Sequence, residues 1–277
     1  MKRILHILAA NPLTLCGAVL VLLVVMAALL ADVIAPYPEH AGAVVDFVNF
    51  NKPPSSTYLF GTDLVGRDLF SRILYAYRIS LLLGVVVLAV AVPVGVALGL
   101  MAGYLSGWCE YLIMRVTDVF LSIPPLVLAM SIMGVLEPTL INGMLAVTAM
   151  WWPWYTRLVY NIVRGEKVEG YVLAAEVIGA SRTHTMFREI LPNCLPAIVT
   201  KMTLDFGFVI LIVSSLSFLG LGVQPPTPDL GSMVADGAKY LPDSWWLSVF
   251  PGLAILVAVF GFNLIGDGLR DILGADT

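Results

Sequence analysis

Residues 79–104 have the sequence ISLLLGVVVLAVAVPVGVALGLMAGY, which contains no charged side chain. A helix needs about 20 predominantly apolar residues to cross the hydrocarbon core of a bilayer, and this stretch is longer than that. Its apolar residues do not alternate with polar ones, as residues 81–87 show, so the pattern is not that of a strand in a membrane barrel. The stretch predicts a membrane-spanning helix.

The composition of the whole chain agrees with this prediction. Of its 277 residues, 59% are hydrophobic and 12% are charged, and the mean hydropathy is +0.92. An ordinary soluble domain carries about 25% charged residues, so lipid is the natural solvent for this chain. The net charge of −4 comes without a basic cluster, which argues against a nucleic-acid partner.

Five further apolar stretches, at 12–32, 110–135, 139–158, 196–219 and 246–267, predict an all-α, polytopic membrane protein with six transmembrane helices. The first stretch is longer than the apolar region of a signal peptide, about 7–15 residues, so we expect it to be retained. An even number of crossings puts both termini on one side. Lys2, Arg3 and the basic residues of loop 159–195 predict that this side is the cytoplasm.

Charged residues inside the predicted spans lie at spacings that predict ion pairs within one helix. Arg115 and Asp118 are three residues apart, and Lys201 and Asp205 are four apart. Both spacings put the partners on one helix face, so we expect each pair to neutralise itself near the cytoplasmic end of its span. A proton or ion pathway is the alternative.

The glycines Gly95, Gly99 and Gly103 predict close helix packing, either within the chain or against a second chain.

The sequence gives no sign of catalysis or of a bound cofactor. It contains no G-x-x-x-x-G-K-[ST] loop, no G-x-S-x-G and no H-E-x-x-H motif. Cys16, Cys109 and Cys194 lie far apart, and neither they nor the three histidines show metal-ligand spacing. We therefore expect no catalytic residue and no metal site.

Three motifs identify a known family. Residues 60–72, FGTDLVGRDLFSR, resemble the F-G-T-D-x-x-G-R-D-x-x-S-R signature of the second permease subunit of dipeptide, oligopeptide and nickel ABC importers. Residues 217–228, SFLGLGVQPPTP, and 262–271, FNLIGDGLRD, are similar to the same family. The resemblance runs from about residue 10 to residue 273.

The resemblance implies a type I ABC importer permease of the bacterial inner membrane that forms half of a translocation path for di- or oligopeptides. It implies a second permease subunit, two cytoplasmic ATPase subunits and an extracytoplasmic binding protein as partners. Residues 1–78 would form the first span with an outer loop, and 79–277 a five-helix core. Nickel or a metal–chelator complex is the alternative cargo. A proton-coupled secondary transporter using Asp118 or Asp205 is the rival class, although no internal repeat supports it.

Two segments carry the expected site residues. The loop at about 160–195 resembles the family's EAA loop, whose short helix docks on the ATPase. Small residues would allow close approach, Gly179 would end the helix and Pro192 would stop local structure before the next span. Leu173 and Glu189 depart from the usual pattern. The expected docking residues are Tyr171, Ala174, Ala175, Gly179, Ala180, Ser181 and Pro192.

The second segment is the outer motif, where glycines permit tight turns and the charged side chains can pair internally. It is expected to act either as a structural cap or as a contact for cargo or its binding protein. Its residues are Gly61, Thr62, Asp63, Gly66, Arg67 and Asp68.

Overall fold

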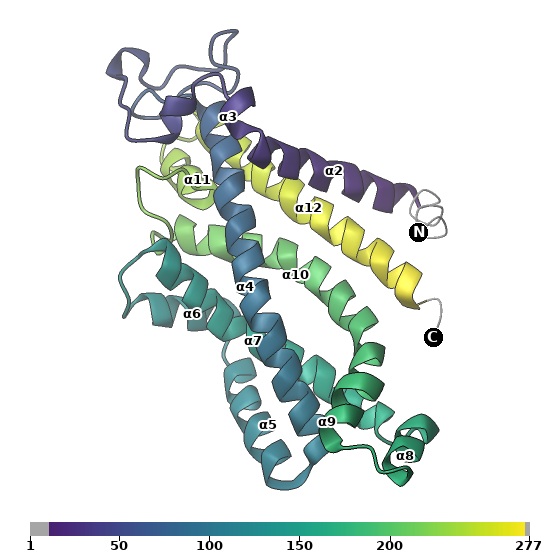
Figure 1. Ribbon diagram of the computed structural model, residues 1–277. Coiled ribbons are helices and arrows are strands. Elements are labelled where there is room, and N and C mark those ends of the chain that lie inside the picture. Colours follow the sequence, from purple (N-terminus) through teal and green to yellow (C-terminus); the bar gives the residue numbers. More distant parts are fainter. Residues whose placement is uncertain (1–10, 275–277) are drawn as a thin grey trace.

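The computed structural model describes residues 11–274, and it confirms an all-α fold (Figure 1). In this part of the chain the sole β-type pairing is an isolated bridge between Thr62 and Asp68. Short turns of helix lie at Pro38–Ala41 and Phe47–Asn49, and a π-helix at Thr185–Ile190. The α-helices are α2 (Pro12–Leu29), α3 (Ala31–Ile34), α4 (Leu69–Leu105), α5 (Gly107–Ser122), α6 (Pro125–Met133), α7 (Leu140–Glu166), α8 (Gly170–Val177), α9 (Arg182–His184), α10 (Leu191–Phe218), α11 (Leu230–Ala238) and α12 (Trp246–Gly274).

Four helical stretches of the described chain are long and apolar enough to cross a membrane: α2, α4, α12 and the continuous helix from Arg182 to Phe218. The bent pair α5 and α6 gives a fifth if it counts as one span. The remaining predicted span, 139–158, corresponds to α7, which is long but carries Trp, Tyr and Pro residues in its middle. Six crossings therefore stay a prediction that depends on α7 and on counting α5 and α6 as one span.

Two predicted spans differ in shape from the expectation. The helix expected to begin at residue 79 begins at Leu69, because Asp68 caps it by accepting a hydrogen bond from the Ser71 N–H at 2.8 Å. The stretch 110–135 is not one continuous helix, since α5 and α6 meet at an angle of 89°. Pro124 and Pro125 explain the break, because proline lacks an N–H and disfavours helix in the preceding residue.

The first and last helices pack against each other along much of their length, and the Pro12 end of α2 lies beside the Gly274 end of α12 (Figure 1). Gly17 and Gly268 make this possible, since a side chain at Gly17 would meet Leu264 and one at Gly268 would meet Thr14. An even number of crossings requires such a placement of the two ends. Lys2 and Arg3, which supported the predicted orientation, lie outside the described residues.

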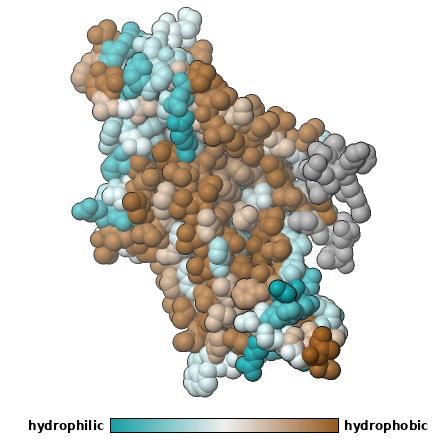
Figure 2. Space-filling view, viewed as in Figure 1, coloured by the Kyte–Doolittle hydropathy of each residue, from teal (hydrophilic) through white to brown (hydrophobic). Residues whose placement is uncertain are grey.

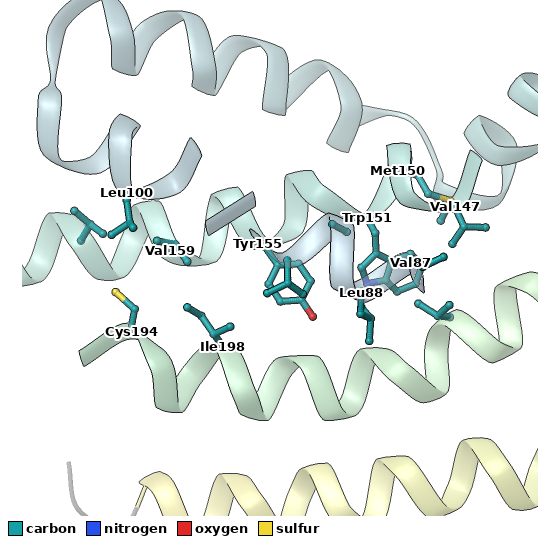
Figure 3. Close-up of a cluster of buried hydrophobic side chains, with 14 of the residues drawn as sticks. Val87, Leu88, Leu100, Val147, Met150, Trp151, Tyr155, Val159, Cys194 and Ile198 are labelled. Carbon is teal, nitrogen blue, oxygen red and sulfur yellow. The ribbon is translucent and has the colours of Figure 1, made fainter. Parts of the chain in front are cut away.

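The largest hydrophobic core forms where α4, α7 and α10 meet, and Figure 3 shows side chains of this cluster. Gly95, Gly99 and Gly103 lie against α7 of the same chain, so the prediction of close packing is confirmed within the chain. The alternative, contact of these glycines with a second chain, is wrong. Because no side chain separates the helices there, residues such as Tyr155 and Val159 become fully buried.

The surface of the helical bundle is largely apolar, while hydrophilic side chains gather at two opposite ends (Figure 2). One end holds the segment between α3 and α4, and the other holds α8 and α9 (Figure 1). This distribution is the one expected of helices surrounded by lipid, with polar segments in water on either side.

Candidate functional site

The outer motif is organised by one carboxylate. Asp63 accepts hydrogen bonds from the backbone N–H groups of Val65 (3.0 Å) and Arg67 (2.9 Å) and forms an ion pair with the Arg67 side chain at 2.7 Å. The buried Arg72 lies 3.6 Å from the same carboxylate and donates to the His40 carbonyl at 3.0 Å. Asp63 thus closes its own turn and links it to the first turns of α4.

Two further motif residues are buried and hydrogen-bonded. The Thr62 hydroxyl donates to the Asn49 carbonyl at 2.5 Å and accepts from the Lys52 N–H at 2.8 Å. Asp68 caps α4, and its own N–H donates to His40 Nδ1 at 2.8 Å. Burial raises the pKa of Asp68, and the hydrogen bonds from Ser71 oppose part of that shift. These contacts join three separate parts of the loop to the start of α4.

The glycines of the motif are required by its backbone. Gly66 has φ +85°, and a side chain there would overlap the Asp46 carbonyl. Gly61 has φ +79° and lies against Lys52 and Trp246. All six motif residues therefore participate in a folded cap over α4 and α12, and their polar groups are largely satisfied within the chain.

At the opposite end, α8 stands out from the bundle and is held by polar contacts (Figure 1). Tyr104 of α4 donates a hydrogen bond to Glu176 at 2.7 Å. Tyr171 donates to Glu166 and accepts from the Asn193 amide at 2.7 Å, so it joins α8 to the ends of α7 and α10. Partial burial and the bond to Glu166 raise the pKa of Tyr171 to about 12.

The two faces of α8 differ. Val172 and Ala175 are buried on the side where α8 packs against the π-helix, and Val172 belongs to the main core. Ala175 therefore does not face outward as its predicted docking role requires. Ala174 and Leu173 are exposed. The helix ends at Val177 with Ile178 as its C-cap, and Gly179 follows with φ +88° and open space around it, which agrees with the predicted helix end.

The most exposed apolar side chains of this end were not among the predicted site residues. Val177 is 86% exposed and Ile178 is 85% exposed, although both are aliphatic. A sequence signal existed, because Leu173 and Val177 are four residues apart and so share a face opposite to Val172. We call Leu173, Val177 and Ile178 the α8 apolar patch.

Pro192 does not end the local helical structure before the next span, contrary to the prediction. Ser181 caps α9 by accepting from the His184 N–H at 3.3 Å, and the chain stays helical from Arg182 to Phe218. Pro192 lies in the first turn of α10 and not at a break. The π-helix immediately before it gives the wider turn that accommodates a residue without an N–H.

The predicted pair on α10 is confirmed, but its location differs. Lys201 Nζ lies 3.1 Å from Asp205 Oδ1, and Trp151 of α7 donates to Asp205 Oδ2 at 3.0 Å. Trp151 and Tyr155 point from α7 toward α10 (Figure 3). Helix α10 begins at Leu191 and continues a helical stretch that begins at Arg182. The pair therefore lies well inside this stretch and not near its start.

The pair predicted between Arg115 and Asp118 is wrong. Asp118 instead forms an ion pair with Arg157 of α7, and the Arg115 guanidinium lies 5.3 Å from the centre of the Tyr111 ring. Packing of α5 against α7 explains the difference, because it brings Arg157 to the carboxylate while Arg115 turns toward its own helix.

A groove of about 670 Å³ lies beside the Lys201–Asp205 pair. Its walls come from the final turns of α7, the first half of α10 and Arg270 of α12. Glu166 and Asn193, which bind Tyr171 of α8, also line it. The groove therefore extends from the Lys201–Asp205 pair to two residues that hold α8 through Tyr171.

Comparisons with known proteins agree with these features. Residues 95–277 match the family described as binding-protein-dependent transport system inner membrane component, and residues 1–54 match the N-terminal transmembrane domain of oligopeptide transport permease C. The chain is 42% identical to a probable D,D-dipeptide transport system permease protein of Escherichia coli, covering 98% of this chain and 90% of that protein. It is 40% identical to a di/tripeptide transport system permease protein of Pseudomonas aeruginosa, over 99% and 91%, and 38% identical to a dipeptide transport system permease protein of Haemophilus influenzae, over 94% and 89%.

Proposed function

The chain belongs to the family of binding-protein-dependent transport system inner membrane components, and we propose that it is a permease subunit of an ATP-binding-cassette importer for di- and oligopeptides. The observation that carries this proposal is the relationship, over nearly the whole chain, to permease proteins of dipeptide and di/tripeptide transport systems. Those names favour peptides over nickel as cargo. ATP hydrolysis belongs to partner subunits in this proposal.

We propose six crossings of the bacterial inner membrane, with both termini in the cytoplasm: α2, α4, the bent pair α5–α6, α7, α10 and α12. The packing of α7 supports its crossing, since its backbone lies against the glycines of α4. Its polar side chains also have partners on α5, because Arg157 pairs with Asp118 and Tyr160 donates to Glu110 at 2.5 Å. Ionisable residues within membrane helices generally pair with one another.

The partners in this proposal are a second permease subunit, two ATPase subunits and an extracytoplasmic binding protein. The α8 apolar patch supports docking of an ATPase, since aliphatic side chains exposed at a polar end of the molecule suit a protein contact. The exposed residues Leu173, Val177 and Ile178 would make this contact, while the buried Ala175 would support α8 from behind.

The test is uptake of a labelled dipeptide into proteoliposomes that contain the complete transporter. Uptake should require ATP, and Val177→Asp should abolish both uptake and copurification of the ATPase subunits. The matched control is Val48→Asp, which puts the same charge on a side chain that is 85% exposed in the loop at the opposite end. Uptake driven by a pH gradient without ATP would instead favour a secondary transporter, and ATP-driven uptake of nickel alone would favour the other cargo.

A further inference from the structure

The groove beside α10 has the size and position of a ligand site. The residues of α10 that line it include Asn193, Ala197, Thr200, Lys201 and Leu204, and each lies three or four residues from another of the set, so they form one face of the helix. Its volume of about 670 Å³ lies within the range of about 300–1,000 Å³ that small-molecule sites occupy.

The acidic groups of the groove already have donors. Asp205 accepts hydrogen bonds from Lys201 and Trp151, and its side chain is only 8% exposed. Glu166 accepts from Tyr171 and, at 3.5 Å, from Asn193. A cationic ligand group would therefore find both carboxylates engaged.

The basic groups of the groove are more available. An ammonium group has three donors, and within the described chain only Asp205 accepts from Lys201. The Lys201 side chain is 27% exposed, with its nitrogen 5.7 Å and 5.5 Å from the ring centres of Trp154 and Tyr155. Arg270, on another wall, has no carboxylate within ion-pair distance among residues 11–274.

A purely structural role does not explain this arrangement. The contact of α7 with α10 is already filled by apolar side chains such as Val159 and Ile198. Ionisable groups inside membrane helices are costly and generally mark functional pathways. The asymmetry of the pair is informative, because Asp205 is buried while Lys201 reaches the groove.

We propose that Lys201 binds the terminal carboxylate of a peptide in this groove, and that Asp205 is a positioning residue that holds the Lys201 ammonium. The inference rests on the proposed function, because it takes a peptide as the cargo. Arg270 supplies a second positive charge along the same groove. The chain would then favour peptides with a free carboxylate over those with a neutral C-terminus, independently of selection by the binding protein.

The experiment compares uptake of a dipeptide with uptake of its C-terminal amide by the complete transporter in proteoliposomes. The double variant Lys201→Gln/Asp205→Asn removes both charges but keeps an acceptor for Trp151. The acid-to-amide ratio of uptake rates should fall about tenfold relative to the wild type, the loss expected for one charged hydrogen bond. Lys201→Arg should keep the ratio. The same binding protein serves all variants, so its own preference cancels.

The outcomes separate this inference from the proposed function. If the double variant transports both peptides with the wild-type ratio, Lys201 does not bind the carboxylate, while the importer function stands. If the wild type transports neither peptide with ATP, the proposed function fails instead. A double variant whose uptake changes only with the anionic lipid content would assign the groove to lipid headgroups and overturn the inference.

A second measurement tests the inference if the double variant fails to insert into the membrane. Leu204→Cys, in a chain whose native cysteines are replaced, places a single thiol in the groove wall while Lys201 and Asp205 are kept. The peptide should slow labelling of this thiol more than its amide does. Equal protection by the two compounds would overturn the inference.

Discussion

The contact of α4 with α7 gives the sharpest prediction about stability. A Cβ atom added at Gly99 would lie 2.7 Å from Val159 Cβ and 2.8 Å from the Thr156 carbonyl oxygen, whereas ordinary contact begins at 3.4 Å. The carbonyl belongs to the backbone of α7 and cannot rotate away. The change Gly99→Ala therefore forces the two helices apart along the main core.

The expected magnitude combines two effects of opposite sign. Alanine favours a helix over glycine by about 1 kcal/mol. Overpacking of a well-packed core costs about 1–3 kcal/mol, and the upper part of that range applies here because backbone atoms block the methyl group. We expect a net loss of about 1–2 kcal/mol in the free energy of unfolding. Gly95→Ala should behave in the same way, since its Cβ would lie 2.5 Å from both Trp152 O and Tyr155 Cβ.

The assay is reversible unfolding of the purified chain in mixed micelles with increasing denaturing detergent. The matched control is Gly252→Ala in α12, where an added Cβ meets nothing within 4 Å. This control should be neutral or more stable by up to about 1 kcal/mol. If Gly99→Ala were as stable as Gly252→Ala, the close packing of α4 on α7 would be refuted.

The other predictions concern charge, topology and nucleotide binding. Arg157→Gln should destabilise the chain by about 1 kcal/mol more than Arg115→Gln, because only the former leaves Asp118 without its ion-pair partner; equal unfolding midpoints would contradict the observed pairing. Burial raises the pKa of Asp229 above its ordinary value of 3.8. At pH values between the unfolded and the folded pKa, the folded chain therefore binds more protons than the unfolded one, and the free energy of unfolding should decline as the pH rises through the folded pKa. Asp229→Asn should remove this decline while keeping the cap of α11, whereas Asp229→Ala should lose about 1 kcal/mol at every pH; unfolding measured from pH 4 to pH 8 decides. A cysteine replacing Glu169 in a chain without native cysteines should react only with reagents added from the cytoplasmic side. Labelling from the external side would contradict the proposed orientation. The isolated chain should not bind ATP in a fluorescent-nucleotide titration, since its sequence contains no G-x-x-x-x-G-K-[ST] loop. Binding at micromolar ATP would be evidence against the proposal that partner subunits bind and hydrolyse the nucleotide.

Much of the site could be anticipated because its signals are local. The capped turn at 60–68 depends on glycines with positive φ and on Asp63 bonding to residues two and four positions away. Likewise, Lys201 and Asp205 pair because four residues make one helical turn. Arg115 and Asp118 had comparable spacing, yet a partner from another helix prevailed, and no local pattern carries that information.

The sequence alone determined that the chain is an all-helical membrane protein of the importer-permease type, because long apolar stretches and contiguous motifs require no knowledge of distant contacts. Only the tertiary structure decided which helix faces meet. It put Gly95, Gly99 and Gly103 against α7, turned Ala175 inward and Val177 outward, and placed Asp205 between Lys201 and Trp151. The physical reason is that helical periodicity defines a face but not its neighbour. The neighbour is set by packing among residues far apart in the chain, and here that packing leaves the α10 groove open beside a buried carboxylate.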